Sequence, residues 1–257
     1  DIMRKDTGVD GDAQRISQMV WMLFMKIFAD KEEEWEITLD NYRSPIPTYC
    51  KWQTWAADEE GLTGEALMEF VDNDMFPELR NLDTRQSPQA KIIRSVFQDT
   101  YNYMKNGTLF RQVINQINQI DFNRNEERHL FNDIYETILK ELQSAGSSGE
   151  YYTPRAVTQF MVDMTDPRLD ETLLDPACGT GGFLTCALEQ LEKQVKSKED
   201  RRTLQNCLAG VEKKPLPHLL CTTNLMLHGF DVPAVKRDNY LAYPYGDWGH
   251  SDKVNVI

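Results

Sequence analysis

Apolar side chains recur at every third or fourth position in the first half of the chain, which is the spacing of an amphipathic α-helix. The clearest example runs from about Asp12 to Ala29, where one continuous apolar stripe comprises Ile16, Met19, Val20, Leu23, Phe24, Ile27 and Phe28. Asp12 stands where its side chain can cap the first turn. Because a stripe of this kind normally faces a core, we interpret the segment as a core helix rather than a ligand site.

Further helices are expected before residue 148, at about 64–76, 87–104, 109–120 and 130–142. Ser87-Pro88 supplies a cap and a proline at the first helical position, and Asn106-Gly107 is expected to end the same helix. No alternating strand pattern occurs in this part of the sequence. Residues 1–148 are therefore predicted to form an all-helical N-terminal domain.

The segment 41–58 interrupts the helical spacing with two prolines and with large aromatic side chains, among them Tyr49, Trp52 and Trp55. It is predicted to be an ordered loop. An aromatic loop can stack on nucleic-acid bases or pack across helices, and we favour packing as the commoner role.

The pattern changes after the run of small residues at 144–149, which is either a passive linker or a loop that orders over a ligand. Helices expected at about 153–165, 182–195 and 216–228 alternate with apolar runs at 172–175, 206–212 and 254–257. Strands and helices in this order are typical of a parallel sheet with right-handed crossovers. The polar stretch from Lys196 to Arg202 is expected to be a loop. Residues 149–257 are thus predicted to be the first half of a Rossmann-like α/β domain.

The strongest chemical signal is the sequence Asp-Pro-Ala-Cys-Gly-Thr-Gly-Gly-Phe at 175–183, between an apolar run and an amphipathic helix. Glycines let the backbone turn sharply and approach a ligand, and open α/β sheets bind ligands at the carboxyl ends of their strands. Gly179 and Gly181 match the first two glycines of the dinucleotide fingerprint, but Leu184 occupies the third place. The leading carboxylate of Asp175 suits a cationic cofactor, whereas a pyrophosphate prefers bare amides. We therefore favour S-adenosylmethionine over a nicotinamide cofactor, and over a turn that binds nothing.

Glu212 ends the next apolar run, Leu-Ala-Gly-Val-Glu at 208–212. An acidic side chain at the end of that strand can accept hydrogen bonds from ribose hydroxyls. It lies 37 positions after Asp175, whereas the fingerprint places its acid about 20 residues after the glycines. We attribute the extra length to the polar stretch before the strand, and favour a ribose contact over a solvated charge.

The formal net charge is −13, with −10 in residues 1–148 and −3 in residues 149–257. A chain that gripped DNA alone would normally present a basic face, so this balance favours a subunit whose partner supplies much of the DNA contact. The five cysteines form no Cys-x-x-Cys pair, which indicates reduced thiols in the cytoplasm. No metal-binding spacing is found, and neither a signal peptide nor an apolar run of the ~20 residues that span a membrane is expected.

Three motifs together resemble the modification subunits of type I restriction–modification systems: Gly-Glu-Tyr-Tyr-Thr-Pro-Arg at 149–155, the glycine turn, and Gly-Val-Glu-Lys-Lys-Pro at 210–215. Residues 10–36 resemble the helical N-terminal domain of the same family, so the resemblance covers essentially the whole chain. It implies an S-adenosylmethionine-dependent methyltransferase domain that methylates N6 of adenine in DNA. It also implies a DNA-specificity subunit, a restriction subunit, double-stranded DNA within the complex, and two modification subunits per complex.

The resemblance assigns roles to individual residues. The methionine end of S-adenosylmethionine would be wrapped by Glu150, Tyr151, Tyr152, Thr153, Pro154 and Arg155. Asp175 would face the ammonium of the cofactor, directly or through water, and Glu212 would hold its ribose. The turn against the cofactor would be lined by Thr180, Gly181 and Gly182. Asp238 is a candidate for the adenine edge of the cofactor, with a solvated loop charge as the alternative.

The family's catalytic Asn-Pro-Pro-aromatic motif holds the target amine and stacks on the flipped base. It is expected after the strand that starts at Val254, but the sequence ends at Ile257, and Asn255 lies within that strand. No catalytic residue is therefore assigned, and this chain alone is expected to be inactive. Two alternatives stay open: an S-adenosylmethionine-dependent methyltransferase of proteins or small molecules, and a non-catalytic assembly module.

Overall fold

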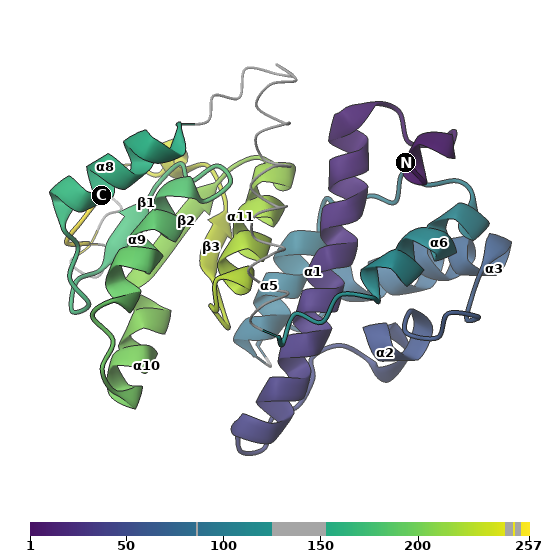
Figure 1. The fold of residues 1–257 in the computed structure, drawn as a ribbon, viewed down its shortest axis with the longest axis horizontal. Helices are drawn as coiled ribbons and strands as arrows, with labels where there is room; N and C mark the ends of the chain where they lie inside the picture. The colour runs from purple at the N-terminus through teal and green to yellow at the C-terminus, as the bar shows by residue number, and fades with distance from the viewer. Residues whose placement is uncertain (86, 125–152, 245–248, 250–252) are drawn as a thin grey trace. The chain divides into compact units, whose positions relative to one another are not determined.

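The computed structural model describes residues 1–85, 87–124, 153–244, 249 and 253–257. The chain divides into two compact units, Asp1–Gly149 and Glu150–Ile257. In Figure 1 the first unit runs from purple to teal and the second from teal-green to yellow. The helix expected at 130–142 and the linker expected at 144–149 lie outside the described residues.

The described part of the first unit is helical and contains no strand, as the sequence predicted. Figure 1 shows the long helix α1 crossing the other helices of this unit. The elements are η1 (Met3–Lys5), α1 (Gly11–Thr38), η2 (Thr48–Cys50), α2 (Trp52–Trp55), α3 (Gly64–Glu69), η3 (Phe70–Met75), α4 (Phe76–Arg80), α5 (Pro88–Phe97) and α6 (Gly107–Ile117).

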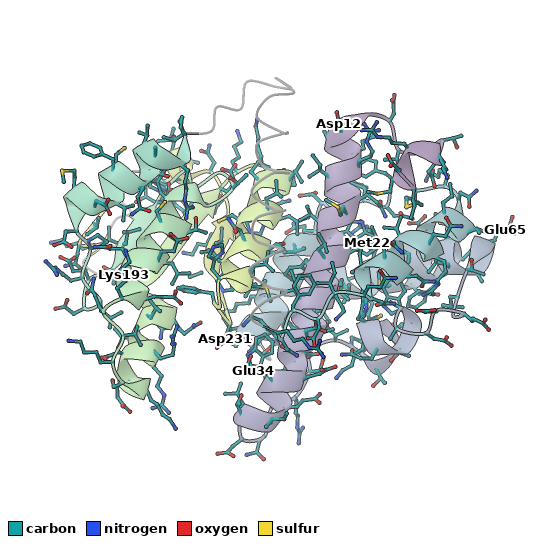
Figure 2. All side chains as sticks on the ribbon, viewed as in Figure 1. Asp12, Met22, Glu34, Glu65, Lys193 and Asp231 are labelled. Atoms are coloured by element: carbon teal, nitrogen blue, oxygen red, sulfur yellow. The ribbon has the colours of Figure 1, made fainter. Side chains whose placement is uncertain are left out.

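Helix α1 continues well beyond the apolar stripe, to Thr38. Trp35 stays buried in the added turns and packs edge-on against Phe28, with ring centroids 5.4 Å apart. The start of α1 also differs from the prediction, because Asp10 occupies the cap position. Asp12, labelled in Figure 2, lies inside the first turn and pairs with Arg15.

Aromatic side chains build the core of this unit. Trp21 is fully buried and meets Phe76 and Phe110 edge-on, with ring centroids 5.0 and 5.8 Å apart. Trp52 and Trp55 are also buried, and they lie in short helical turns where a loop was expected. The two tryptophans thus pack as predicted, Trp55 against Phe70 with ring centroids 5.7 Å apart, whereas Tyr49 of the same segment is exposed.

Two predicted helix boundaries between α5 and α6 were wrong. Helix α5 ends at Phe97, because Arg80 donates hydrogen bonds to the carbonyls of Phe97 and Thr100 at 3.0 and 2.7 Å. The Phe97 carbonyl also accepts from the backbone N–H of Thr100 at 3.3 Å, three residues on, whereas in a longer α-helix it would accept from the residue four positions on. Asn106 begins α6 rather than ending α5, since its Oδ1 accepts from two backbone N–H groups of the following turn at 3.0 Å.

The second unit contains a parallel sheet, in which β1 (Leu173–Asp175), β2 (Leu208–Glu212) and β3 (Ala234–Arg237) lie in the order β1-β2-β3. Val256 forms a parallel bridge with Leu173, on the edge of β1 that β2 leaves free. The segment at 254–257 is therefore the fourth parallel segment along the chain. The third is β3, which the sequence analysis missed because its short Ala-Val-Lys-Arg run is half exposed at the sheet edge.

One helix precedes these strands and others connect them, as the pattern of alternating elements predicted. They are α8 (Arg155–Thr165), α9 (Gly182–Glu192), α10 (Lys198–Cys207) and α11 (Pro215–Leu227), with a short turn η4 (Tyr240–Ala242) after β3. The prediction of a loop from Lys196 to Arg202 was wrong, since most of this stretch forms the start of α10. Ser197 and Asp200 make a reciprocal capping box there, which starts the helix although its surface is strongly polar.

The fold class is confirmed: a helical N-terminal unit precedes an α/β unit with a parallel sheet. All five cysteines are buried free thiols. Among the described residues there is no helix with the length and apolar character needed to cross a bilayer. The same residues contain no cluster of three or more potential metal ligands.

Candidate functional site

Three carboxylates lie at the carboxyl edge of the sheet. Asp175 is the last residue of β1, Glu212 is the last residue of β2, and Asp238 directly follows β3. The backbone N–H of Asp238 donates to the carbonyl of Glu212 at 3.0 Å, so the ends of β2 and β3 are adjacent. This edge is where parallel α/β sheets bind their ligands.

The glycine turn between β1 and α9 has the backbone conformation that its composition predicted. Gly179 and Gly181 have φ angles of +54° and +86°, in the left-handed region that favours glycine. A Cβ on Gly181 would lie 2.7 Å from Cys221 Sγ, whereas a Cβ on Gly179 would meet no atom within 4 Å. One glycine therefore packs against α11, while the other leaves the backbone of the turn open to a ligand.

Glu212 holds this turn in place. Its Oε2 accepts from the backbone N–H of Gly179 at 3.0 Å, and its Oε1 accepts from that of Lys214 at 2.7 Å. A carboxylate offers about four acceptor positions, so these two bonds leave capacity for hydroxyl donors. The acid at the end of β2 thus belongs to the same site as the turn after β1.

Asp175 is half-buried, and its Oδ1 accepts from the backbone N–H of Ala177 at 3.1 Å. Burial raises the pKa of Asp175 above its ordinary value, and the negative charge of Glu212 raises it further. A cation beside Asp175 would offset both effects. The electrostatics of this edge therefore suit a ligand that carries a positive charge.

The remaining residues of the turn connect it to the neighbouring helices. Thr180 is buried, and its carbonyl accepts from Asn224 Nδ2 on α11 at 3.4 Å. Gly182 is the first residue of α9, directly after Gly181 at the cap position. The structure thus brings together the predicted residues Asp175, Thr180, Gly181, Gly182 and Glu212.

The predicted segment before α8 is described only in part. Glu150, Tyr151 and Tyr152 lie outside the described residues, while Thr153 and Pro154 are exposed at the start of α8. The guanidinium of Arg155 contacts α9, where it donates to Thr185 Oγ1 at 2.9 Å and to Glu189 Oε1 at 2.6 Å.

Sequence reasoning missed the partners of several of these residues. Thr185 was not singled out, although a threonine three positions after a helix-starting glycine can bond back to that first turn. Asp238 accepts from the hydroxyl of Tyr243, and this hydrogen bond lowers the pKa of Asp238. Asn255 Oδ1 accepts from the N–H and hydroxyl of Thr172 at 2.9 and 3.0 Å, so this side chain is used within the fold.

A parallel sheet with a glycine turn after its first strand and an acid at the end of its second defines a Rossmann-like α/β protein. The comparisons with known proteins identify the family. Residues 126–257 match the N-6 DNA Methylase family and residues 1–117 match the HsdM N-terminal domain. The chain belongs to the N-6 DNA methylase family, in the group that includes the modification subunits of type I restriction enzymes.

Individual relatives agree with this assignment. The chain is 57% identical over 261 residues to the type I restriction enzyme EcoEI methylase subunit of Escherichia coli, a match that covers all of this chain and 53% of that one. It superimposes with a TM-score of 0.85 and 41% identity on a type I modification subunit from Vibrio vulnificus YJ016, over 99% of this chain and 57% of that one. A chain from a structural study of assembly and conformational transition in a type I system gives a TM-score of 0.80 at 34% identity, with 93% and 49% covered. The chain therefore spans about half the length of these relatives.

Proposed function

We propose that this chain is the cofactor-binding part of a type I modification subunit, which transfers a methyl group from S-adenosylmethionine to N6 of adenine in DNA. The observation that carries the proposal is the pair of acids, Asp175 and Glu212, at the ends of adjacent strands around one glycine turn. The membership of the N-6 DNA methylase family favours DNA over a protein or a small molecule as the methyl acceptor.

The residues at the sheet edge fit S-adenosylmethionine. Asp175 would face the ammonium, because its carboxylate is half-buried and lies near the negative charge of Glu212, and no cation pairs with it among the described residues. Glu212 would accept from the ribose hydroxyls while it still holds the Gly179 amide. Thr180, Gly181 and Gly182 would line the turn against the cofactor, which the open side of Gly179 lets approach. When bound, the cofactor supplies an electrophilic methyl group on a sulfonium.

The segment before α8 would close the methionine end of the cofactor. Thr153 and Pro154 are exposed at the start of that helix, and Glu150, Tyr151 and Tyr152 precede them in the sequence. The sequence of 257 residues contains no Asn-Pro-Pro-aromatic motif to hold a target amine. We therefore infer that this chain binds the cofactor without transferring its methyl group.

Titration of the cofactor into the chain tests this proposal. We expect S-adenosylmethionine to bind with one site per chain, and NAD not to compete with it, because two carboxylates at the strand ends would repel a pyrophosphate. Binding of NAD in preference to S-adenosylmethionine would overturn the assignment. Absence of binding by either compound would favour a non-catalytic assembly module.

We further propose that residues 1–148 serve assembly rather than chemistry. Their net charge of −10 disfavours independent DNA binding, so a DNA-specificity subunit would supply much of the contact with double-stranded DNA. A restriction subunit and a second modification subunit would complete the complex, which would act in the cytoplasm where the DNA lies. Deletion of residues 1–143 from the complete subunit should abolish stable assembly on DNA and leave cofactor binding intact. Specific methylation at the parent rate by that deletion would contradict this role.

A further inference from the structure

Arg155 ties the beginning of α8 to α9. It is the first residue of α8, which lies alongside α9 (Figure 1). Its guanidinium donates to Thr185 Oγ1 at 2.9 Å and to Glu189 Oε1 at 2.6 Å. Those two acceptors are one turn apart on α9, so the planar fork of the guanidinium fixes the position of α8 along α9.

Thr185 connects this fork to the glycine turn. Its side chain is fully buried, and its hydroxyl donates to the carbonyl of Gly182 at 3.1 Å while it accepts from Arg155. A hydroxyl can donate and accept at the same time. Two consecutive hydrogen bonds therefore join the start of α8 to the last glycine of the turn. The backbone N–H of Thr185 also donates to the carbonyl of Gly181 at 2.9 Å.

A second contact joins the same two places. Thr158, in the first turn of α8, is buried and donates from its hydroxyl to the carbonyl of Arg155 at 2.9 Å. A Cβ on Gly182 would lie 4.0 Å from Thr158 Cγ2, which is ordinary van der Waals distance. The first turn of α8 thus packs against the end of the glycine turn, and Thr153 and Pro154 lead directly into that contact.

We propose that Arg155 is a positioning residue that acts through Thr185. It holds Thr153 and Pro154, which lead into α8, in register with the glycine turn, so that both contact the methionine end of S-adenosylmethionine. This role replaces the direct cofactor contact that the sequence resemblance implied for Arg155. The inference rests on the proposed function, because it concerns the same cofactor site.

Two ligands distinguish a positioning role of Arg155 from a direct cofactor contact and from a purely structural role. S-adenosylmethionine carries the methionine end, whereas 5′-methylthioadenosine keeps the nucleoside and lacks the amino acid. Both are titrated into the complete chain, into Arg155→Gln and Thr185→Val, and into the double variant. We expect each single variant to bind S-adenosylmethionine about 10-fold more weakly, the effect of losing one hydrogen bond to a charged group. The double variant should bind S-adenosylmethionine no more weakly than the single variant with the lower affinity. The affinity of every variant for 5′-methylthioadenosine should equal that of the parent.

The controls keep stability apart from positioning. Thr185→Ser retains the hydroxyl and should bind S-adenosylmethionine like the parent. Arg168→Gln removes an exposed ion pair with Asp166 just beyond the other end of α8 and should affect neither ligand. Thermal unfolding of every variant shows whether it is folded.

Three results would overturn the inference. Parent-like binding of S-adenosylmethionine by Thr185→Val, with a loss in Arg155→Gln, would mean that Arg155 contacts the cofactor itself. Equal losses for both ligands would mean that the contact only stabilises the fold. Parent-like binding of S-adenosylmethionine by both single variants would mean that neither Arg155 nor Thr185 positions the cofactor site. Failure of the parent chain to bind S-adenosylmethionine would instead contradict the proposed function, and is recognised before any variant is compared.

Discussion

The carboxylate of Glu212 accepts a hydrogen bond from the backbone N–H of Gly179, with 3.0 Å between Oε2 and the nitrogen. These two residues are far apart in the sequence: Glu212 ends β2, and Gly179 lies in the turn that follows the neighbouring strand β1. The bond means that the acid proposed to hold the ribose also shapes the turn proposed to receive the rest of the cofactor. Ribose recognition and turn geometry therefore depend on one side chain.

Replacing Glu212 tests this double role. Glu212→Gln keeps the length of the side chain, but its amide nitrogen cannot accept a hydrogen bond, so one of the present partners or the ribose loses its acceptor. Affinity for S-adenosylmethionine should fall about 10- to 150-fold, which corresponds to a loss of about 1.5–3 kcal/mol. Calorimetric titration measures the change.

A matched control for Glu212 is Glu192→Gln, since Glu192 is partly exposed at the end of α9 and pairs with Arg201. It should bind the cofactor like the parent. Removal of the 2′-hydroxyl from the cofactor should reduce its affinity for the parent protein. The same removal should reduce its affinity for Glu212→Gln much less. An equal loss in both proteins would show that Glu212 does not contact the ribose.

The pKa of Asp175 predicts a pH dependence of cofactor binding. Burial and the charge of Glu212 raise this pKa, so Asp175 gains its proton at a higher pH than an ordinary aspartate. Only the ionised carboxylate attracts the ammonium, so the affinity for S-adenosylmethionine should fall on acidification, and the fall should begin at a higher pH than an ordinary aspartate would give. The α-amino group of the cofactor stays charged during this change. Asp175→Asn should bind weakly, with little dependence on pH. The same slope in both proteins would exclude Asp175 as the group that titrates.

The two left-handed glycines should differ in their tolerance of a methyl group. Gly179→Ala places a Cβ in open space, so it should destabilise by the backbone strain alone, about 1–2 kcal/mol. Gly181→Ala adds a contact of 2.7 Å with Cys221 Sγ, and overpacking of this kind costs about 1–3 kcal/mol more. Urea unfolding compares the two variants. Cys221→Ala in the Gly181→Ala background should recover part of the loss, and a smaller effect at position 181 than at 179 would contradict the packing described.

His218 should make the second unit sensitive to acid. It is buried on α11, its Nε2–H donates to the carbonyl of Val235 on β3 at 3.2 Å, and burial lowers its pKa from 6.5 to about 4. Between these two values the unfolded chain binds more protons than the folded one. The free energy of unfolding should therefore decrease as pH falls below 6.5. This residue alone should contribute a loss of about 1.4 kcal/mol for each pH unit.

Urea unfolding between pH 7 and about 5 tests the histidine prediction. His218→Gln retains an N–H donor but does not titrate, so it should show a shallower loss of stability on acidification than the parent. Equal slopes for the parent and His218→Gln would show that His218 does not couple to folding.

The sequence predicted the parts of the site that follow from strand ends and turn composition. Asp175 and Glu212 could be placed together because parallel strands bring their carboxyl ends to one edge, and Gly181 could be placed in the turn because few other residues adopt its backbone angles. The bond between Glu212 and Gly179 depends on a side-chain rotamer and on register, so no local pattern indicates it. Arg155 was assigned to the cofactor because its motif resembles that of a known family, and the sequence carries no sign that Thr185 lies beside it.

The errors in the fold have similar physical causes. Strand β3 is a short edge strand with one half-buried valine, Val235, and therefore lacks an apolar run. Helix α10 buries little more than Leu204 and Cys207, so its polar first turns resembled a loop. Helix α5 ends where Arg80 donates to the carbonyls of Phe97 and, just beyond the helix, Thr100. Such a contact between residues distant in the sequence does not show in helical periodicity.

Hydrogen–deuterium exchange with and without S-adenosylmethionine tests the central claim most directly, because it locates the cofactor on the intact chain. The account predicts slower exchange in residues 175–182, which include the glycine turn, and in residues 211–214 around Glu212, with no change in residues 1–124. Binding of the cofactor with protection confined to residues 1–124, or with none at the carboxyl edge of the sheet, would contradict it.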